Sequence, residues 1–421
     1  MRHALFVAFH FPPEASSSGV LRTLKFVRYL PERGWRVSVI TAERSAYEVQ
    51  DPGLESQVPE GTRVIRTRCP NTKREWSWRG VYPALLALPD VWIGWMPHAV
   101  RAGRELIARD PVDVVYSTSP HATAHLIGGR LARAAQLPWI TDFRDPWIED
   151  PPEPGAPSGP VFTTVNRWLE RRTVRDASAV VSSTPRLREL FRQRYPDERD
   201  TKLRVILNGY DEADFQGRPI APMRSGPRLR IAHAGSINAD FRDPRPLFES
   251  IARLIREGLV IAPELDIRFI GGGAFGESPD LQAAIARSGL RDAVTLVPRV
   301  PYEASLQELG AADLLLLLQA SDDTVGLVPA KLYEYLRAQK PTLALVREGA
   351  VSDVMAHVGG GFAADPAMSA NLDEALRAIL REWRAGTLGR NVASVAALQR
   401  YDRRALTGEL AELFDEASAT R

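Results

Sequence analysis

Cysteine is nearly absent from this chain, and its scarcity excludes two kinds of site. Cys69 is the only cysteine among the 421 residues. A single cysteine cannot form an intrachain disulfide or supply a cysteine-based metal site. The histidines include no HExxH pattern of a zinc enzyme. His121 and His125 are four residues apart, but no carboxylate lies between them, so we expect no metal site there.

Long apolar runs and an excess of charge are also missing. Prolines and an aspartate interrupt the most apolar stretch, 81–100, so we expect no membrane-spanning helix. The net charge of +2 excludes a strongly basic nucleic-acid binder. The chain opens directly on a strand-like run, MRHALFVAFHF, rather than on a signal peptide. This start predicts a cytoplasmic protein.

The composition that remains is typical of a soluble globular enzyme, with 44% hydrophobic and 25% charged residues. A chain of 421 residues is too long for one ordinary hydrophobic core, so we expect two domains of about 200 residues each. Around 210–227 the pattern breaks into polar, glycine and proline residues, which indicates a linker. We predict domains over 1–212 and 228–395, and a helical segment, 396–421, that returns to the first domain.

Short β-branched runs alternate with helix-like stretches in both halves, as in parallel α/β units. We expect strands at 4–9, 36–41, 63–67, 112–117, 138–143, 179–183, 203–207, 229–234, 266–270, 293–297, 313–318 and 342–346. An amphipathic helix is predicted over 401–419. The predicted fold class is therefore α/β, with two doubly wound Rossmann-like domains facing across a cleft.

The loop after the first strand ends in serines and a glycine. In doubly wound sheets, ligands bind beyond the carboxyl ends of the strands. Ser18 and Gly19 immediately precede a predicted helix, whose free amides and positive end favour a phosphate. We expect these two residues to bind substrate there. The alternative is an ordinary capped loop.

Charged residues follow the fifth predicted strand in the segment TDFRDPW. Asp145 can serve as a base or hold a sugar hydroxyl, and Arg144 can bind a phosphate with two hydrogen bonds. His121 follows the preceding strand at the same edge, either as an acceptor contact or as the residue that starts a helix. An internal Arg–Asp pair that fixes the loop is the alternative for the other two.

The second domain opens on a glycine and an arginine in the segment IAHAGSINADFR. Gly235 ends the first strand, and Arg242 lies just before the next helix. An arginine at this edge can neutralise a diphosphate leaving group. Arg245 is a second candidate, and a surface arginine is the alternative.

The segment GLVPAKLYEYL follows the apolar run LLLLL and begins a helix. Lys331 and Glu334 are three residues apart and share one helical face. Lys331 adds positive charge for a phosphate, and Glu334 can accept hydrogen bonds from ribose hydroxyls. A surface salt bridge between the two is the alternative.

The glycines of GGGAFG, 271–276, formally match a dinucleotide-binding fingerprint. Glu277, Ser278 and Pro279 separate them from the following helix. The fingerprint needs its last glycine in the first turn of that helix. We therefore expect no NAD site here.

Taken together, these motifs resemble a bacterial glycosyltransferase of family 4 with the two-domain GT-B fold. The resemblance covers nearly the whole chain and depends on the shared order of FPPE with Ser-Ser-Gly, DVVYSTSP, PWITDFRDPW, VILNGYD, the Ala-Gly-Ser turn and VPAKLYEYL. It implies a nucleotide-sugar donor bound mostly by the second domain and an acceptor bound mostly by the first. It also implies retention of the anomeric configuration and no required metal or other cofactor.

The resemblance also implies roles for individual residues. Glu334 would bind the ribose, Arg242 the diphosphate, and Gly19 would lie near the donor phosphates. The chain departs from the family pattern at two positions. Gly326 stands where a glutamate often touches the donor sugar, and Ser236 stands where a basic residue often follows the glycine.

The segment Lys73–Arg104 combines basic residues with four tryptophans. Such a mixture suits the headgroup layer of an anionic membrane. A lipid-linked acceptor at the inner membrane face, with peripheral contact of the enzyme, would explain it. Aromatic packing under a lid over the cleft is the alternative.

We therefore expect a retaining glycosyltransferase that moves a hexosyl or related sugar to an acceptor hydroxyl, in the synthesis of a cell-surface polysaccharide or glycolipid. One alternative is a sugar-nucleotide epimerase of the same fold, which would make product without any acceptor. The other is a non-catalytic, nucleotide-binding partner of another transferase.

Overall fold

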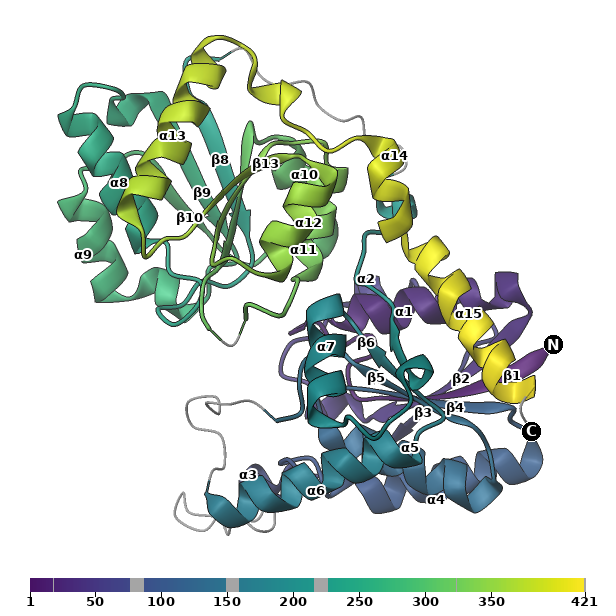
Figure 1. Cartoon of the computed structure of the whole chain (residues 1–421). Helices are drawn as coiled ribbons and strands as arrows, with labels where there is room; N and C mark the ends of the chain where they lie inside the picture. Colours follow the sequence, from purple (N-terminus) through teal and green to yellow (C-terminus); the bar gives the residue numbers. More distant parts are fainter. Residues whose placement is uncertain (18, 76–86, 149–158, 216–225, 323, 420–421) are drawn as a thin grey trace. The chain divides into compact units, whose positions relative to one another are not determined.

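A computed structural model describes residues 1–17, 19–75, 87–148, 159–215, 226–322 and 324–419, which form two compact units (Figure 1). Unit 1 is Met1–Asn208 with Arg403–Arg421, and unit 2 is Gly209–Asp402. Unit 2 extends to Asp402 because the segment before it still packs on this unit. The ring of Tyr401 lies 4.9 Å from that of Tyr333 between centroids.

Unit 1 is built on a parallel sheet of seven strands in the order β3-β2-β1-β4-β5-β6-β7. The strands are β1 Arg2–Ala8, β2 Trp35–Ala42, β3 Arg63–Thr67, β4 Val114–Thr118, β5 Trp139–Phe143, β6 Ala179–Ser182 and β7 Leu203–Val205. The helices are α1 Gly19–Tyr29, α2 Pro52–Glu55, α3 Thr72–Glu75, α4 Trp95–Arg109, α5 Ala122–Ala135, α6 Pro160–Asp176, α7 Pro185–Arg194 and α15 Arg403–Ala419. The strand order reverses between β1 and β4, which makes their carboxyl ends the expected ligand position.

The central strand of unit 1 is buried on both faces, which explains its unbroken apolar sequence. Phe6 packs toward α1 and α15, with its ring 6.2 Å from that of Phe414. Leu5 and Val7 point to the other face and join Trp95 of α4 in a second cluster. The C-terminal helix α15, yellow in Figure 1, lies beside α1 and completes this core.

Unit 2 repeats the pattern with six parallel strands in the order β10-β9-β8-β11-β12-β13. The strands are β8 Leu229–Ala234, β9 Leu265–Ile270, β10 Val294–Val297, β11 Leu314–Gln319, β12 Thr342–Val346 and β13 Gly361–Ala364. The helices are α8 Arg245–Arg256, α9 Pro279–Arg287, α10 Tyr302–Gly310, α11 Ala330–Arg337, α12 Ala350–Val358, α13 Ser369–Arg384 and α14 Val395–Leu398. Its strand order reverses between β8 and β11. The two doubly wound sheets confirm the predicted α/β fold class.

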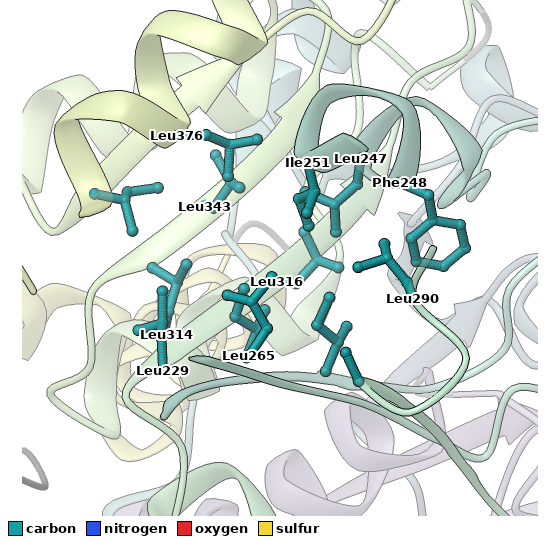
Figure 2. Close-up of a cluster of buried hydrophobic side chains, with 14 of the residues drawn as sticks. Leu229, Leu247, Phe248, Ile251, Leu265, Leu290, Leu314, Leu316, Leu343 and Leu376 are labelled. Atoms are coloured by element: carbon teal, nitrogen blue, oxygen red, sulfur yellow. The ribbon is translucent and has the colours of Figure 1, made fainter. Parts of the chain in front are cut away.

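The LLLLL run forms β11, and its side chains alternate between the two covered faces. Figure 2 shows Leu314 and Leu316 on one face, beside Leu229 and Leu343 of neighbouring strands and Leu247 of α8. Every residue of β11 is buried. Full burial on both sides is what a continuous apolar run predicts for a parallel strand.

The edge strand β13 was not predicted, because the three successive glycines 359–361, of which the last begins the strand, give no strand signal. Gly361 has a φ of 151°, and a Cβ there would collide with the Thr342 backbone. Only glycine allows β13 to approach β12 at this point.

Within the described ranges, none of the helices combines the length and the apolarity needed to span a bilayer.

Candidate functional site

Arg144, which follows β5, is fixed between the loops at the carboxyl edge of the first sheet. Its backbone N–H donates to Ser119 Oγ at 2.8 Å, and its guanidinium donates to the Ser119 carbonyl. The Ser183 hydroxyl in turn donates to the Arg144 carbonyl at 2.8 Å. These contacts tie together the loops that follow β4, β5 and β6. Arg144 is therefore positioned before any ligand arrives.

Gly19 opens α1 directly against this arginine. A Cβ at Gly19 would overlap the guanidinium of Arg144, so only glycine allows the present approach. Burial lowers the pKa of Arg144, and Asp145 and Asp142 partly offset this effect. Its Nε has no hydrogen-bond partner among the described residues. The start of α1 and the guanidinium of Arg144 thus lie side by side, and both favour the binding of an anion. Ser18 lies outside the described residues.

A buried Arg–Asp pair does lie at this edge, but Arg22 and Asp142 form it rather than Arg144 and Asp145. Arg22 of α1 donates through Nε and a terminal nitrogen to the two carboxylate oxygens of Asp142, at 2.9 and 2.8 Å. Tyr116 and Thr118 also donate to Asp142, at 2.5 and 3.0 Å. Asp142 is the last polar residue of β5. Its position in a buried strand was the sequence feature that could have indicated a buried ion pair.

His121 lies at the same edge, as the N-cap residue of α5. It meets a histidine that sequence reasoning missed: the rings of His10 and His121 stack at 5.2 Å between centroids and 25° between planes. His10 Nδ1 lies 2.8 Å from Glu14 Oε2. Burial lowers the pKa of His121 well below its ordinary value, and the nearby His10 and Arg144 lower it further. The sequence feature that could have indicated His10 was the segment HFPPE, directly after the first strand.

Asp145 shares this environment. Burial raises its pKa, while Arg144 and His10 oppose the rise. A raised pKa is typical of carboxylates that handle protons. The structure thus brings together Gly19, His121, Arg144 and Asp145, all from the predicted set.

In unit 2, Gly235 follows β8 and lies against Lys331 of α11. Lys331 Nζ donates to the Ala234 carbonyl at 2.7 Å, and the Ala234 N–H donates to Tyr335 Oη at 2.9 Å. Gly235 has a φ of 118°. The start of α11 is therefore joined to the end of β8, at the point where the strand order reverses.

Arg242 follows the same turn. Its guanidinium donates to Ser236 Oγ at 2.8 Å and lies 4.8 Å above the Phe241 ring. Burial lowers its pKa, so its charge is incompletely solvated. The second candidate, Arg245, is instead paired with Asp243, with 2.8 Å between Nε and Oδ2. Arg242 is therefore the better of the two for an anionic ligand.

Lys331 and Glu334 have different principal partners, although they share one helical face. Glu334 accepts a hydrogen bond from Tyr302 Oη at 2.8 Å. Burial and the nearby Arg242 lower the pKa of Lys331 to about 7, although Glu334 acts in the opposite direction. Arg242 and Lys331 thus place two positive charges close together at one end of this sheet. A bound phosphate would neutralise them.

The GGGAFG segment does not form a dinucleotide fingerprint. A 3₁₀ turn spans Ala274–Glu277, and α9 begins only at Pro279, with Ser278 as its cap. The last glycine, Gly276, therefore lies outside the helix. The segment therefore lacks the geometry of that fingerprint.

Two of the four tryptophans in the segment Lys73–Arg104 are packed inside unit 1, and Trp76 and Trp78 lie outside the described residues. Trp95 is fully buried, and its Nε1 donates to Thr67 Oγ1 at 2.8 Å. The ring of Trp92 lies 4.6 Å from that of Phe9. Packing therefore accounts for Trp92 and Trp95.

Among the described residues, no group of three or more His, Cys, Asp or Glu side chains could hold a metal ion.

We expect Gly235→Ala to weaken any anion site at this turn beyond the cost of its backbone strain. A Cβ would lie 2.5 Å from Lys331 Nζ, and the positive φ adds about 1–3 kcal/mol of strain. Gly258→Ala is the matched control, because Gly258 has a φ of 70° with no atom within 4 Å of the added Cβ. Thermal unfolding with and without a nucleoside diphosphate measures both effects. Equal ligand-induced shifts in the two variants would contradict the prediction.

The N-terminal part of the chain matches a known domain family. Residues 19–209 match the sequence model of the Glycosyl transferase 4-like domain. One curated relative is the alpha-D-kanosaminyltransferase of Streptomyces kanamyceticus, 28% identical over 193 residues. That alignment covers 44% of this chain and 46% of the relative, so the chain spans about half of the enzyme that it matches.

Solved structures match the chain over nearly its whole length. Anabaena Alr3699/HepE, in complex with UDP and glucose, is 18% identical with a TM-score of 0.68, covering 99% of this chain and 100% of that one. A sucrose-phosphate synthase from Thermosynechococcus elongatus is 15% identical with a TM-score of 0.66 and 100% coverage of both chains. At such identities the likeness shows the fold alone. The chain therefore has the GT-B fold, and its residues 19–209 are similar to glycosyl transferase 4-like domains.

Proposed function

We propose that this protein is a glycosyltransferase that moves a hexosyl or related sugar from a nucleotide-sugar donor to an acceptor hydroxyl, with retention of configuration. The similarity of residues 19–209 to glycosyl transferase 4-like domains supports transfer as the reaction class. HepE, which has the same fold, was solved with UDP and glucose, which supports a nucleotide-sugar donor.

The observation that carries the proposal is the positively charged turn of unit 2. Arg242 and Lys331 converge near Gly235, and Glu334 lies on the same helix as Lys331. Two cations suit the diphosphate of a donor, and a carboxylate suits the hydroxyls of its ribose. During transfer, Arg242 and Lys331 would stabilise the charge that develops on the departing nucleoside diphosphate. No metal ion is required in this scheme.

The acceptor would bind at the carboxyl edge of the first sheet, where His121, Arg144 and Asp145 lie. We place the enzyme in the cytoplasm, peripheral to the inner membrane, in the synthesis of a cell-surface polysaccharide or glycolipid. A hollow on unit 1 supports contact with an anionic, lipid-linked acceptor. Its lining is Met96, Pro97, Val100, Arg101, Arg104, Glu105 and Arg130, so three arginines face one carboxylate, which pairs with Arg101.

The first experiment is thermal unfolding with a panel of nucleoside diphosphates and sugar nucleotides. One matching nucleotide should stabilise the wild type by about 2.7 kcal/mol at a hundredfold excess over its dissociation constant. Glu334→Ala should lose most of this stabilisation, because it removes the carboxylate proposed to bind the ribose. Glu374→Ala, an exposed glutamate of α13, is the matched control and should keep it.

The selected sugar nucleotide is then incubated with water, with simple sugars and with membrane lipids as acceptors, and NMR determines the anomer formed. Product made without any acceptor and without hydrolysis would favour an epimerase. Binding without consumption of any donor would favour a non-catalytic partner. No stabilisation by any nucleotide would overturn the proposed function.

A further inference from the structure

Tyr302, the first residue of α10, contacts the carboxylate that would bind the donor ribose. Its hydroxyl donates to Glu334 Oε1 at 2.8 Å and to Asp214 Oδ2 at 3.3 Å. A phenol has one proton, so Glu334 is the principal acceptor and Asp214 the weaker, second one. The three residues come from α10, from α11 and from the 3₁₀ turn Glu212–Asp214, and all belong to unit 2.

The hydroxyl of Tyr302 keeps its proton in these surroundings. Burial raises its pKa well above the ordinary value, and the carboxylates of Glu334 and Asp214 raise it further. A protonated phenol can donate, and an ionised carboxylate can accept about four hydrogen bonds. Glu334 can therefore accept from Tyr302 and from ribose hydroxyls at the same time.

The bond from Tyr302 orders Glu334 before a nucleotide arrives. Glu334 is only half-buried, and a glutamate side chain in such a place can populate several rotamers. Ordering a long side chain during binding reduces the affinity for the ligand. Because the phenol already holds one carboxylate oxygen, this ordering occurs during folding instead.

The segment 209–215, which opens unit 2, is attached to the same helix. Arg337 lies one turn after the ribose carboxylate on α11, and its Nε donates to Glu212 Oε2 at 2.6 Å. Its guanidinium also lies 5.0 Å from the centroid of the Phe215 ring. Asp214, between these two residues, reaches the phenol of α10. Three residues of this segment therefore contact α11 directly or through one hydroxyl.

We propose that Tyr302 is a positioning residue of the donor site, which orients the Glu334 carboxylate for the ribose hydroxyls and connects it through Asp214 to the segment 209–215. This inference rests on the proposed function and deepens it. Glu334 touches the nucleotide, whereas Tyr302 acts on the nucleotide only through Glu334. Because coupling between two sites is reciprocal, occupation of the site should also stabilise the segment 209–215.

The direct test is Tyr302→Phe, which removes the hydroxyl and keeps the ring. It should weaken binding of the nucleoside diphosphate selected by thermal unfolding about 3- to 10-fold, the usual effect of ordering one long side chain on binding. Calorimetry measures the affinity. Tyr195→Phe is the matched control, because the Tyr195 hydroxyl also donates to a carboxylate, that of the buried Glu170 in unit 1. The control should bind the nucleotide as the wild type does.

A ligand without ribose hydroxyls separates positioning from a merely structural role. The 2′,3′-dideoxy analogue of the same nucleotide offers Glu334 no hydroxyl, so the wild type and Tyr302→Phe should bind it equally. In the Glu334→Ala background, Tyr302→Phe should have no further effect, because a positioning residue acts only through its carboxylate. Unchanged affinity of Tyr302→Phe for the full nucleotide would overturn the inference, as would an equal loss for the dideoxy analogue.

Hydrogen exchange tests the connection to the segment 209–215. Nucleotide binding to the wild type should slow exchange of the Asp214 and Phe215 amides, which donate to carbonyls within the same turn. Tyr302→Phe should lose most of this protection. Equal exchange with and without the nucleotide would overturn the role of Asp214. A wild type that binds no nucleotide would instead overturn the proposed function, and this inference with it.

Discussion

Replacing Asp142 with alanine is expected to lower the free energy of unfolding of unit 1 by about 3–5 kcal/mol, the usual cost of removing one partner of a buried ion pair. Asp142 is fully buried and holds the guanidinium of Arg22, which is 1% exposed. Without the carboxylate, the arginine charge remains buried and uncompensated. Tyr116 and Thr118 lose the same acceptor. Hydrogen exchange of β5 amides in increasing urea measures the loss within this unit.

Glu105→Ala is the control for this change. Its partner Arg101 is 84% exposed, so the ion pair at 3.0 Å contributes about 1 kcal/mol at most. A loss for Asp142→Ala no larger than that of Glu105→Ala would contradict the prediction. The pH dependence has a definite sign, because burial alone would raise the pKa of Asp142 but Arg22 lowers it overall. The stabilisation is therefore complete above the unfolded pKa of 3.8 and is lost as the pH falls through the lower folded value.

Replacing Lys331 with methionine is expected to weaken binding of a nucleoside diphosphate about 10- to 100-fold, the usual range for a hydrogen bond to a charged group. It should also remove a pH dependence. In the free protein the pKa of Lys331 is about 7, and a bound diphosphate raises it. Binding above pH 7 must therefore take up a proton. We expect the wild type to bind the nucleoside diphosphate about tenfold less tightly for each pH unit in that range.

Calorimetry of nucleoside diphosphate binding at pH 8, in buffers of different ionisation enthalpy, measures the proton uptake directly. The nucleotide used is the one that stabilises the wild type in thermal unfolding. Lys202→Met, a change in unit 1, should leave the uptake intact, whereas Lys331→Met should abolish it. Equal affinity of the wild type at pH 7 and pH 9 would contradict the prediction.

The same lysine gives the stability of the protein without ligand the opposite pH dependence. Between the folded pKa of about 7 and the unfolded value of 10.5, the unfolded chain binds more protons, so stability should rise with pH.

Much of the fold could be predicted because most of its strands are short and largely buried. Predicted strands at 63–67, 229–234 and 342–346 have the same bounds in the structure. The strands at 229–234 and 342–346 are largely buried, and their sequences are mostly apolar. The strand at 63–67 is a partly buried edge strand, which its β-branched residues indicate. The edge strand β13 could not be predicted, because three successive glycines carry no such pattern. Its place depends on the close approach of Gly361 to Thr342.

The candidate site could be predicted only in part. Position after a strand indicated Gly19, His121, Arg144 and Asp145, because the carboxyl ends of parallel strands share one edge. His10 was missed, since its only local signal was the loop HFPPE. Its importance depends on the stack with His121, more than a hundred residues away.

The sequence by itself determined the alternation of strands and helices, the two-unit organisation and the loops that carry chemistry, because each is a local consequence of hydrophobic period and turn residues. Only the tertiary structure decided which of these loops meet. Spacing left a salt bridge between Lys331 and Glu334 as the alternative to ligand binding, yet Lys331 bonds to Ala234, 97 residues away. The same holds for Arg22 with Asp142, 120 residues apart. Strand order sets such partners, and strand order is a property of the whole sheet.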